Sequence, residues 1–223
     1  MKRKIILAST SPHRKGLLQQ IGLEFEVMPS DYQEDMSLRL SPKKMVMKFA
    51  EGKAEDVANN RASGATIIGV DTIVVCRGKK LGKPHSKEEA KKMLKRMSGR
   101  TVKVYSGICI IDTDANGRKK IVDYELTKAK MKRLSQEEIQ SYVDTGEPMG
   151  KSGAMDIQGM GAIFIESIKG CYSNIVGFPL NNLYRNLKKL GIDILEYEKW
   201  KGKSPEEDNP GSKVNIRELL TDS

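Results

Sequence analysis

The stretch Ala65–Cys76, A-T-I-I-G-V-D-T-I-V-V-C, decides the fold of this 223-residue chain because it is an almost unbroken apolar and β-branched run. The run is too short to cross a membrane and predicts a buried strand, or two short strands that meet at Gly69. An ionised carboxylate in a dry strand is costly unless it is paired, bound to a metal or open to a cleft. Asp71, the one carboxylate here, is therefore predicted to lie in a functional site. The alternative is a structural aspartate that caps a turn or pairs with a lysine.

The composition indicates a soluble globular protein. With 38% hydrophobic and 30% charged residues, 223 positions can form one large or two small domains with a proper core. No run approaches the roughly 20 apolar residues that a membrane span needs. The basic and briefly apolar segment 1–9 predicts a first strand rather than a signal peptide. Three widely spaced cysteines favour neither a disulfide framework nor a zinc site, and a reducing cytoplasm fits them best.

A formal net charge of +10 raises the question of a polyanionic partner. Lys87, Lys91 and Lys95, however, fall at helical spacing beside glutamates, which is typical of a solvated helix face. Aromatic residues make up only 5% of the chain, so stacking platforms for single strands are not visible. We therefore expect neither nucleic acid nor a membrane to be the main partner.

The N-terminal segment predicts a strand, a polar turn and a helix. Lys4–Ala8 is the strand, Ser11 is a suitable N-cap, and Pro12 suits the first helical position. This geometry directs free backbone N–H groups at whatever lies above the strand, and it suits a phosphate. The turn region also carries Ser9, His13 and Arg14. The alternative is a plain capped helix with exposed charges.

A long helix is predicted after a short strand at Phe25–Pro29 and a polar loop at Ser30–Leu40, which contains Glu34. The helix begins at Ser41-Pro42, and Lys53 falls on its apolar stripe. The ammonium of Lys53 must either extend to solvent or meet an anion.

The rest of the chain predicts hairpins and helices, so we expect a mixed α/β sheet with polar turns gathered over one edge. The predicted elements are a hairpin turn at Arg77–Lys80, a helix at about Ser86–Met97, strands at Thr101–Ile111 and Lys119–Lys130 joined by a turn at Asp112–Gly117, a helix capped by Ser135 and ending at Gly146, a glycine-rich loop at Gly146–Gly161, a strand at Gly161–Ile168 and a helix at Pro179–Leu190.

Candidate site groups occur on six separate segments: Ser9 to Arg14, Glu34, Lys53, Asp71-Thr72, Lys83, and Lys151 to Gln158. Two carboxylates could hold Mg²⁺ or activate a water, and several cations could neutralise a polyphosphate. Spacing alone does not establish that these groups converge.

The string Leu7–Leu18, L-A-S-T-S-P-H-R-K-G-L-L, resembles the signature L-A-S-x-S-P-R-R-x-x-L-L of the Maf family of nucleoside triphosphate pyrophosphatases. The resemblance covers about residues 4 to 195 and leaves out the tail after about Lys199. Further segments match the family in order and spacing: Lys53–Ala54, Gly69–Val74, Gly82–Pro84, Ser98–Gly99, Gly146–Pro148, Lys151–Ala154, Ile157–Gly159 and Asn174–Leu180.

The resemblance implies hydrolysis of a nucleoside triphosphate to the monophosphate and pyrophosphate with a divalent cation, Mg²⁺ or Mn²⁺. It also implies an elongated, forked mixed sheet flanked by helices, with two lobes and a central cleft, as in Maf and inosine triphosphate pyrophosphatase-like folds. We expect one domain at 1–198 and a mobile polar tail at 199–223, in which 214–220 could form a short docking helix. A homodimer, common in the family, is a further expectation.

By the same resemblance, Asp71 is the general base and Glu34 and Asp71 place the metal. The groups assigned to catalysis or to phosphate oxygens are Lys53, Lys83, Arg14, Ser9 and Ser11. The residues assigned to substrate binding and choice are His13, Thr72, Lys151 and Gln158. Members with glutamine at the position of Gln158 act on dTTP and UTP, whereas glutamate there marks a subgroup that acts on 7-methyl-GTP. An amide can both donate to and accept from the O4 and N3–H edge of uracil or thymine.

One departure concerns His13, which replaces the first arginine of S-P-R-R by a group that is not permanently charged. Our hypothesis is that His13 weakens a phosphate or base contact and makes it pH-dependent; the alternative is that it faces solvent. A pyrophosphatase for a modified nucleotide and a regulatory binding protein linked to septum formation in cell division remain competing interpretations.

Replacing His13 with arginine should therefore alter the nucleotide profile, the pH profile, or both, because a permanent cation would replace a titrating group. Initial rates with a nucleotide panel between pH 6 and 9 measure both profiles. Profiles that both stay unchanged would contradict the hypothesis.

Overall fold

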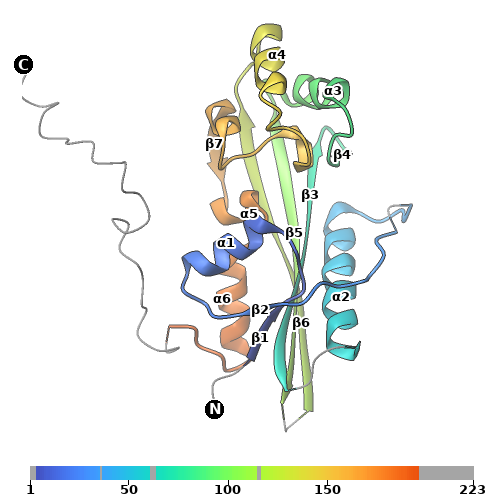
Figure 1. The fold of residues 1–223 in the computed structure, drawn as a ribbon, viewed down its shortest axis with the longest axis vertical. Coiled ribbons are helices and arrows are strands. Elements are labelled where there is room, and N and C mark those ends of the chain that lie inside the picture. The colour runs from blue at the N-terminus through green and yellow to red at the C-terminus, as the bar shows by residue number, and fades with distance from the viewer. Residues whose placement is uncertain (1–3, 36, 61–63, 115–116, 196–223) are drawn as a thin grey trace, which may run out of the picture.

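Three long strands run side by side along most of the molecule and set its elongated shape (Figure 1). The structure is a computed structural model that describes residues 4–35, 37–60, 64–114 and 117–195. The strands are β3 (Ala65–Cys76), β5 (Thr101–Asp114) and β6 (Gly117–Met131), and each pairs antiparallel with the next. The Ala65–Cys76 run is thus one continuous strand through Gly69, and all its residues except Thr72 are buried. The strands β5 and β6 extend further than predicted into the turn that joins them.

The sheet forks along one edge of β3. Below the fork, β1 (Lys4–Leu7) pairs parallel with β3 as far as Ile68, and β2 (Glu26–Val27) follows β1. Above the fork, β4 (Lys79–Leu81) pairs antiparallel with β3 from Val74 onward. Residues 69–73 therefore have a strand neighbour, β5, on one side only. The sheet is mixed, as predicted, and Asp71 lies at the middle of the open stretch.

The sheet has the order β2-β1-β3-β5-β6-β7, with β4 beside β3 and β7 formed by Ile165–Lys169. The helices are α1 (Pro12–Gln20), α2 (Pro42–Asn60), α3 (Lys87–Met97), α4 (Gln136–Asp144), α5 (Tyr172–Val176) and α6 (Leu180–Lys189), with two 3-10 helices, η1 (Ser152–Ala154) and η2 (Met160–Phe164). None of the helices in the described residues is long and apolar enough to span a bilayer.

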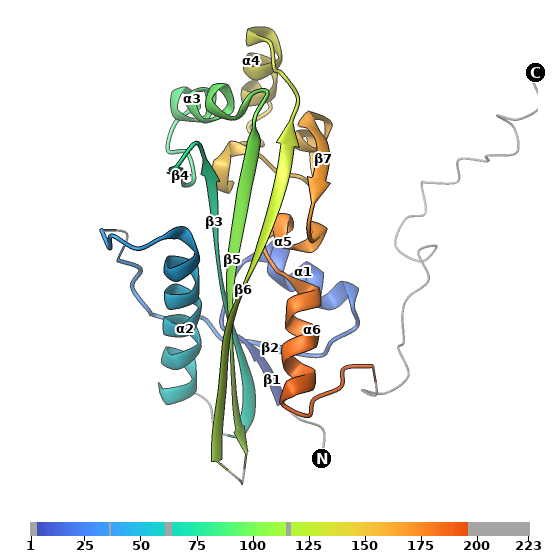
Figure 2. The same cartoon turned by 180° about the vertical axis from the view of Figure 1, so that it is seen from behind.

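Two groups of helices pack on one face of the sheet and leave a space between them. Val70 and Val74 point to the same face because side chains alternate along a strand. Val70 packs in a core with α1 and α6, whereas Val74 packs in a core with α3 and α4. We call these two ends the lower and the upper lobe, as they stand in Figure 1. The helix α2 covers the opposite face of the sheet, on the other side from α6 in both views (Figures 1 and 2).

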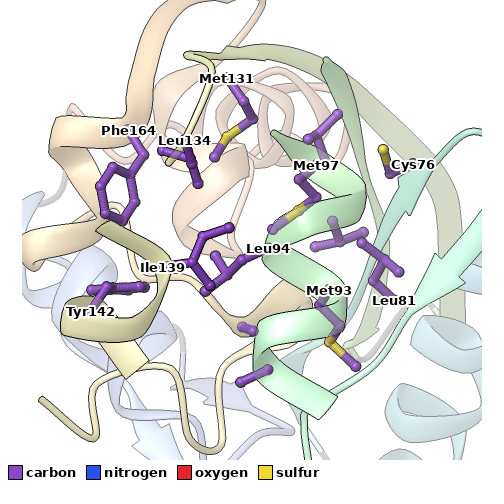
Figure 3. Packing of buried hydrophobic residues seen from close by; sticks show 14 of the residues in the cluster. Cys76, Leu81, Met93, Leu94, Met97, Met131, Leu134, Ile139, Tyr142 and Phe164 are labelled. Carbon is purple, nitrogen blue, oxygen red and sulfur yellow. The ribbon is translucent and has the colours of Figure 1, made fainter. Parts of the chain in front are cut away.

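The upper lobe has a methionine-rich core between α3, α4 and the sheet (Figure 3). Met93 and Met97 of α3 lie in it, and the flexible thioether fills irregular gaps between helices. Both helices begin as the sequence predicts, since Ser86 caps α3 and Ser135 forms a capping box with Glu138 at α4.

Two predicted segments require correction. The turn at Arg77–Lys80 comprises only Arg77 and Gly78, both with positive φ, as a two-residue hairpin requires, and Lys79 and Lys80 belong to β4. The predicted strand at Gly161–Ile168 begins as η2, because the N–H groups of Met160 and Gly161 donate to the carboxylate of Glu147 instead of to a strand. The short helix α5 was not predicted, and the tail 199–223 lies outside the described residues.

Gly107 allows α2 to lie against the sheet directly opposite Asp71. It pairs in register with Asp71, and a Cβ at this position would come within 2.1 Å of the backbone oxygen of Val46 in α2. A larger residue would therefore push away the helix that carries Lys53.

The substitution Gly107→Ala should lower the free energy of unfolding by about 1–3 kcal/mol, the usual cost of overpacking. Urea denaturation measures it. The matched control is Gly16→Ala in α1, where a Cβ would meet nothing within 4 Å and should stabilise the helix by roughly 0.5–1 kcal/mol. Equal urea midpoints for both variants and the parent would contradict the claim that the close approach of α2 to the sheet excludes a side chain at position 107.

Candidate active site

A cleft of about 1170 Å³ opens at the unpaired edge of β3. This volume is slightly above the range of about 300–1,000 Å³ that is usual for small-molecule pockets. Both lobes contribute to its wall: the Ser9–Arg14 turn, Glu34, Lys53 and Asp71 from below, and Lys83 with the 150–157 loop from above. Apolar residues form a further part of the lining, among them Val74, Met97, Val102, Val104 and Ala129.

An ion bridge lies at the open edge. The Nζ atom of Lys53 is 2.6 Å from Oε1 of Glu34 and 2.8 Å from Oδ1 of Asp71. The side chain of Lys53 is only 15% exposed, so it meets an anion rather than extending to solvent. Asp71 is buried, and its second carboxylate oxygen makes no hydrogen bond within the described part of the chain. The structure thus shows that Asp71 pairs with a lysine and lies at the cleft, and its role in a functional site stays a prediction.

Arg14 joins the N-terminal turn to the opposite side of β3. It donates to Oγ of Ser9 and to the backbone oxygen of Gly177, both at 3.1 Å, and to Oγ1 of Thr72 at 3.5 Å. Burial lowers the pKa of Arg14, while Asp71 and Glu34 oppose that shift. An arginine nevertheless stays a cation in a protein. Asp71 and Thr72 reach the same cleft from opposite faces because no strand covers this edge.

The turn at the start of α1 differs from the prediction in one detail. Ser11 stands at the N-cap position, but its side chain makes no capping hydrogen bond. Its backbone N–H donates instead to Oγ of Ser9, at 3.3 Å. The hydroxyl of Ser11 is therefore not used to cap the helix.

His13 lies in a polar cluster with the upper loop. Its Nε2 atom is 2.7 Å from Nζ of Lys151 and 3.4 Å from Oδ2 of Asp156, and its Nδ1 atom is 2.8 Å from Oε1 of Gln158. Nζ of Lys151 is 2.6 Å from Oδ2 of Asp156. Burial raises the pKa of Asp156, but the hydrogen bonds from Lys151 and from the N–H of Gln158 lower it overall. His13 thus faces the upper loop, and the solvent-facing alternative is wrong.

The structure brings all but one of the predicted site residues into the cleft lining: Ser9, Ser11, His13, Arg14, Glu34, Lys53, Asp71, Thr72, Lys83 and Lys151. Gln158 is the exception. It is exposed at the rim of the cleft, and its side chain contacts His13, which lines the cleft. Lys83 is exposed and has no ion pair among the described residues.

Sequence reasoning missed the contacts of Asp156 and Gly177. A lysine and an aspartate five residues apart in a glycine-rich loop do not specify an ion pair. The carbonyl of Gly177 accepts from Arg14 and Thr72, and every residue has a carbonyl, so no sequence signal marked it.

The donor set fits a divalent cation that arrives with a phosphorylated ligand. No group of three or more His, Cys, Asp or Glu residues forms a metal site in the described ranges. Glu34 and Asp71 nevertheless converge on one point, where Lys53 bridges them. Mg²⁺ commonly binds through one or two carboxylates plus substrate phosphates. The lining carries five lysine and arginine side chains against four carboxylates, so its own charge would neutralise little of a triphosphate.

Glu147 holds the upper loop in place. Its Oε1 atom accepts from the hydroxyl of Tyr142 at 2.8 Å and from the N–H of Gly161 at 3.0 Å, and its Oε2 atom accepts from the N–H of Met160 at 2.9 Å. Burial raises the pKa of Glu147, but these hydrogen bonds lower it overall. The hydroxyl of Tyr142 in turn accepts from the N–H of Asp156.

The architecture and the site are those of a mixed α/β protein with a polar cleft between two lobes. Residues 4–190 match the family model described as Maf-like protein. The chain therefore belongs to the Maf family. A dTTP/UTP pyrophosphatase of Desulforamulus reducens is 45% identical over 86% of this chain and all of its own length, and one of Clostridium tetani is 47% identical over 85% and 98%.

Likeness to solved structures is weaker. A nucleoside-triphosphatase / dITP/XTP pyrophosphatase from Mycobacterium abscessus aligns with 13% identity and a TM-score of 0.39, over 84% of this chain and 97% of that one. The family assignment rests on the sequence match.

Lowering the pH should remove the stabilisation that Glu147 gives to the loop. Its folded-state pKa lies below the unfolded value of about 4.3, so its contribution is present above that value and is lost as the pH falls through the folded pKa. The difference in free energy of unfolding between the parent and Glu147→Gln, measured in urea, should therefore shrink between pH 6 and pH 3. A difference that stays constant over this range would contradict the assignment.

Proposed function

We propose that this protein hydrolyses nucleoside triphosphates, dTTP and UTP in particular, to the monophosphate and pyrophosphate. The observation that carries the proposal is the convergence of Glu34, Lys53 and Asp71 beside a cationic N-terminal turn in one cleft. The names of the relatives, which match over nearly their whole length, support the same activity and substrates.

In this proposal the triphosphate lies along the open edge of β3. Arg14 and Lys83 from the two lobes would bind phosphate oxygens, with the hydroxyls of Ser9 and Ser11 as further donors. Lys83 suits this task because it has no ion pair to give up within the described part of the chain. The apolar part of the lining would take the sugar and the base.

Asp71 acts as the general base. Its unbonded carboxylate oxygen would accept a proton from a water while that water attacks the α-phosphorus. A bond forms between the water oxygen and phosphorus, the bond from phosphorus to the oxygen that bridges to the β-phosphate breaks, and pyrophosphate leaves. Lys53 holds the carboxylate of Asp71 in place and would stabilise the negative charge that builds up on the phosphoryl oxygens.

Glu34 and Asp71 would hold the divalent cation, Mg²⁺ or Mn²⁺. Such a cation supplies charge neutralisation and polarises phosphoryl oxygens. In this structure Lys53 bridges the same two carboxylates and holds them close together.

Base choice would depend on Gln158 and Thr72. An amide at the rim can match the O4 and N3–H edge of uracil and thymine, which a carboxylate, having no donor, cannot. This favours the pyrimidine substrates over 7-methyl-GTP. We also propose that the protein is cytoplasmic and forms a homodimer.

Pyrophosphate release from dTTP, UTP, CTP, GTP, 7-methyl-GTP and ITP, with Mg²⁺ or Mn²⁺, tests the proposal. We expect activity on dTTP and UTP, its loss with excess EDTA, and a decrease in kcat of roughly 10²–10⁴-fold in Asp71→Asn, the usual contribution of a general base. The matched control is Asp144→Asn on α4, whose exposed carboxylate pairs with Lys87 and should leave the rate unchanged.

Three outcomes would contradict parts of this proposal. Full activity in Asp71→Asn would remove the base assignment. Activity confined to 7-methyl-GTP would move the substrate to the modified nucleotide. No release from any nucleotide by the folded protein would favour the regulatory binding protein.

A further inference from the structure

A row of three lysines crosses one face of the sheet in the upper lobe. Lys103 of β5 pairs in register with Lys128 of β6, and Lys128 pairs in register with Lys169 of β7. Residues directly opposite each other on neighbouring antiparallel strands lie on the same face of a sheet. All three lysines are exposed. Because neighbouring strands lie about 4.8 Å apart, the row is evenly spaced over roughly 10 Å.

The lysine row lies on the face of the sheet that α2 covers in the lower lobe. Val75 of β3 pairs with Lys103 on one side and with Lys80 of β4 on the other, and Val75 packs in a core with α2. Beyond that core the face is open: in Figure 2 no helix lies in front of the upper parts of β5 and β6. The helices α3 and α4 pack on the other face. The row therefore faces solvent across the described part of the upper lobe.

No carboxylate of the described residues pairs with this row, although other lysines nearby do have partners. Lys120 pairs with Glu51, and Lys132 pairs with Glu138. Strand β5 has no carboxylate between Thr101 and Ser106. Glu125 of β6 lies on the opposite face and approaches Arg185 of α6. Like charges directly opposite each other destabilise a sheet, so the row has a cost that its own surroundings do not offset.

An evenly spaced line of unpaired cations matches a linear polyanion. Lysines bind the phosphates of a nucleic acid without regard to its base sequence, and the release of condensed counterions drives this binding. Tyr105 follows Lys103 by two residues on β5, so it lies on the same face, and it is half-buried. An aromatic side chain on an open sheet face is the kind of platform on which single-stranded nucleic acids stack their bases.

A membrane surface fits this face less well. Proteins that lie on a bilayer usually insert apolar side chains beside their basic residues. The exposed large apolar side chains of the described residues all lie outside the strands of this face: they are Val27, Met160, Ile163, Tyr172 and Leu195. The face thus offers positive charge without an apolar anchor.

We propose that the open face of the upper lobe binds single-stranded nucleic acid through its phosphates, with Lys103, Lys128 and Lys169 as the contacts. This binding is additional to the proposed nucleotide hydrolysis and does not depend on it. It accounts for part of a net charge of +10 that the cleft does not use. The three lysines are far apart in the chain, and only the strand register brings them together. A search for basic clusters along the sequence therefore does not find them.

Fluorescence anisotropy with a labelled oligothymidylate tests the proposal. For three phosphate contacts, log K should fall with log[salt] with a slope of about −2, a loss of roughly 20-fold between 50 and 200 mM salt. The triple variant Lys103→Gln/Lys128→Gln/Lys169→Gln should lose most of the affinity and most of the slope. Its urea midpoint should equal or exceed that of the parent, because opposed like charges have been removed. Lost binding would then not be the result of unfolding.

The matched control is Lys87→Gln/Lys92→Gln/Lys95→Gln, which makes the same change in net charge on α3, behind the sheet. It should retain both the affinity and the salt slope of the parent. Binding should also persist in Asp71→Asn and in the presence of excess UTP with EDTA, since the oligonucleotide does not occupy the cleft.

Equal salt slopes in the two triple variants would overturn the inference, and so would displacement of the oligonucleotide by UTP. Tighter binding to a duplex of the same length, or binding to phosphatidylserine vesicles but not to the oligonucleotide, would overturn the assignment to a single strand. A protein that binds the oligonucleotide through the row but hydrolyses no nucleotide would overturn the proposed function alone.

Discussion

The strand β3 has an open edge between Ile68 and Val74, and the position of the cleft follows from it. The strand pairs with β1 below this stretch and with β4 above it, and over residues 69–73 it has only β5 as a neighbour. An unpaired edge inside a sheet exposes backbone groups that a neighbouring strand would otherwise satisfy. Here the gap also lets Asp71 and Thr72, which point to opposite faces, reach one cleft. A strand at this edge would bury the carboxylate and close the site.

Electrostatics explains how a carboxylate is tolerated in this strand. Asp71 is buried, and its charge is balanced by Lys53, which also meets Glu34. The lysine comes from α2, and α2 approaches closely only because Gly69 and Gly107 carry no side chains. The packing of one helix against two glycines thus determines the distance of an ion pair on which the proposed chemistry depends.

The two lobes meet across the cleft through a second polar chain. Glu147 anchors Tyr142, Tyr142 accepts from the backbone of Asp156, and Asp156 holds Lys151 against His13 of the lower lobe. A series of linked hydrogen bonds stabilises the fold most when every polar group in it has a partner, because an unpaired buried polar group is costly. The upper loop therefore has a defined position despite its many glycines.

The long strands, most of the helices and their caps can be predicted from the sequence, since they follow from local periodicity and from residues such as Ser86, Ser135 and Pro12. The family can be identified from the sequence as well, because its motifs occur in this chain in the same order and spacing. The sequence does not reveal that Lys53 bridges two carboxylates, that Asp156 contacts Lys151 and His13, or that Gln158 lies at the rim of the cleft. These are contacts between segments far apart in the chain or within an irregular loop. Local propensity does not encode them, because they depend on how the helices pack across the sheet.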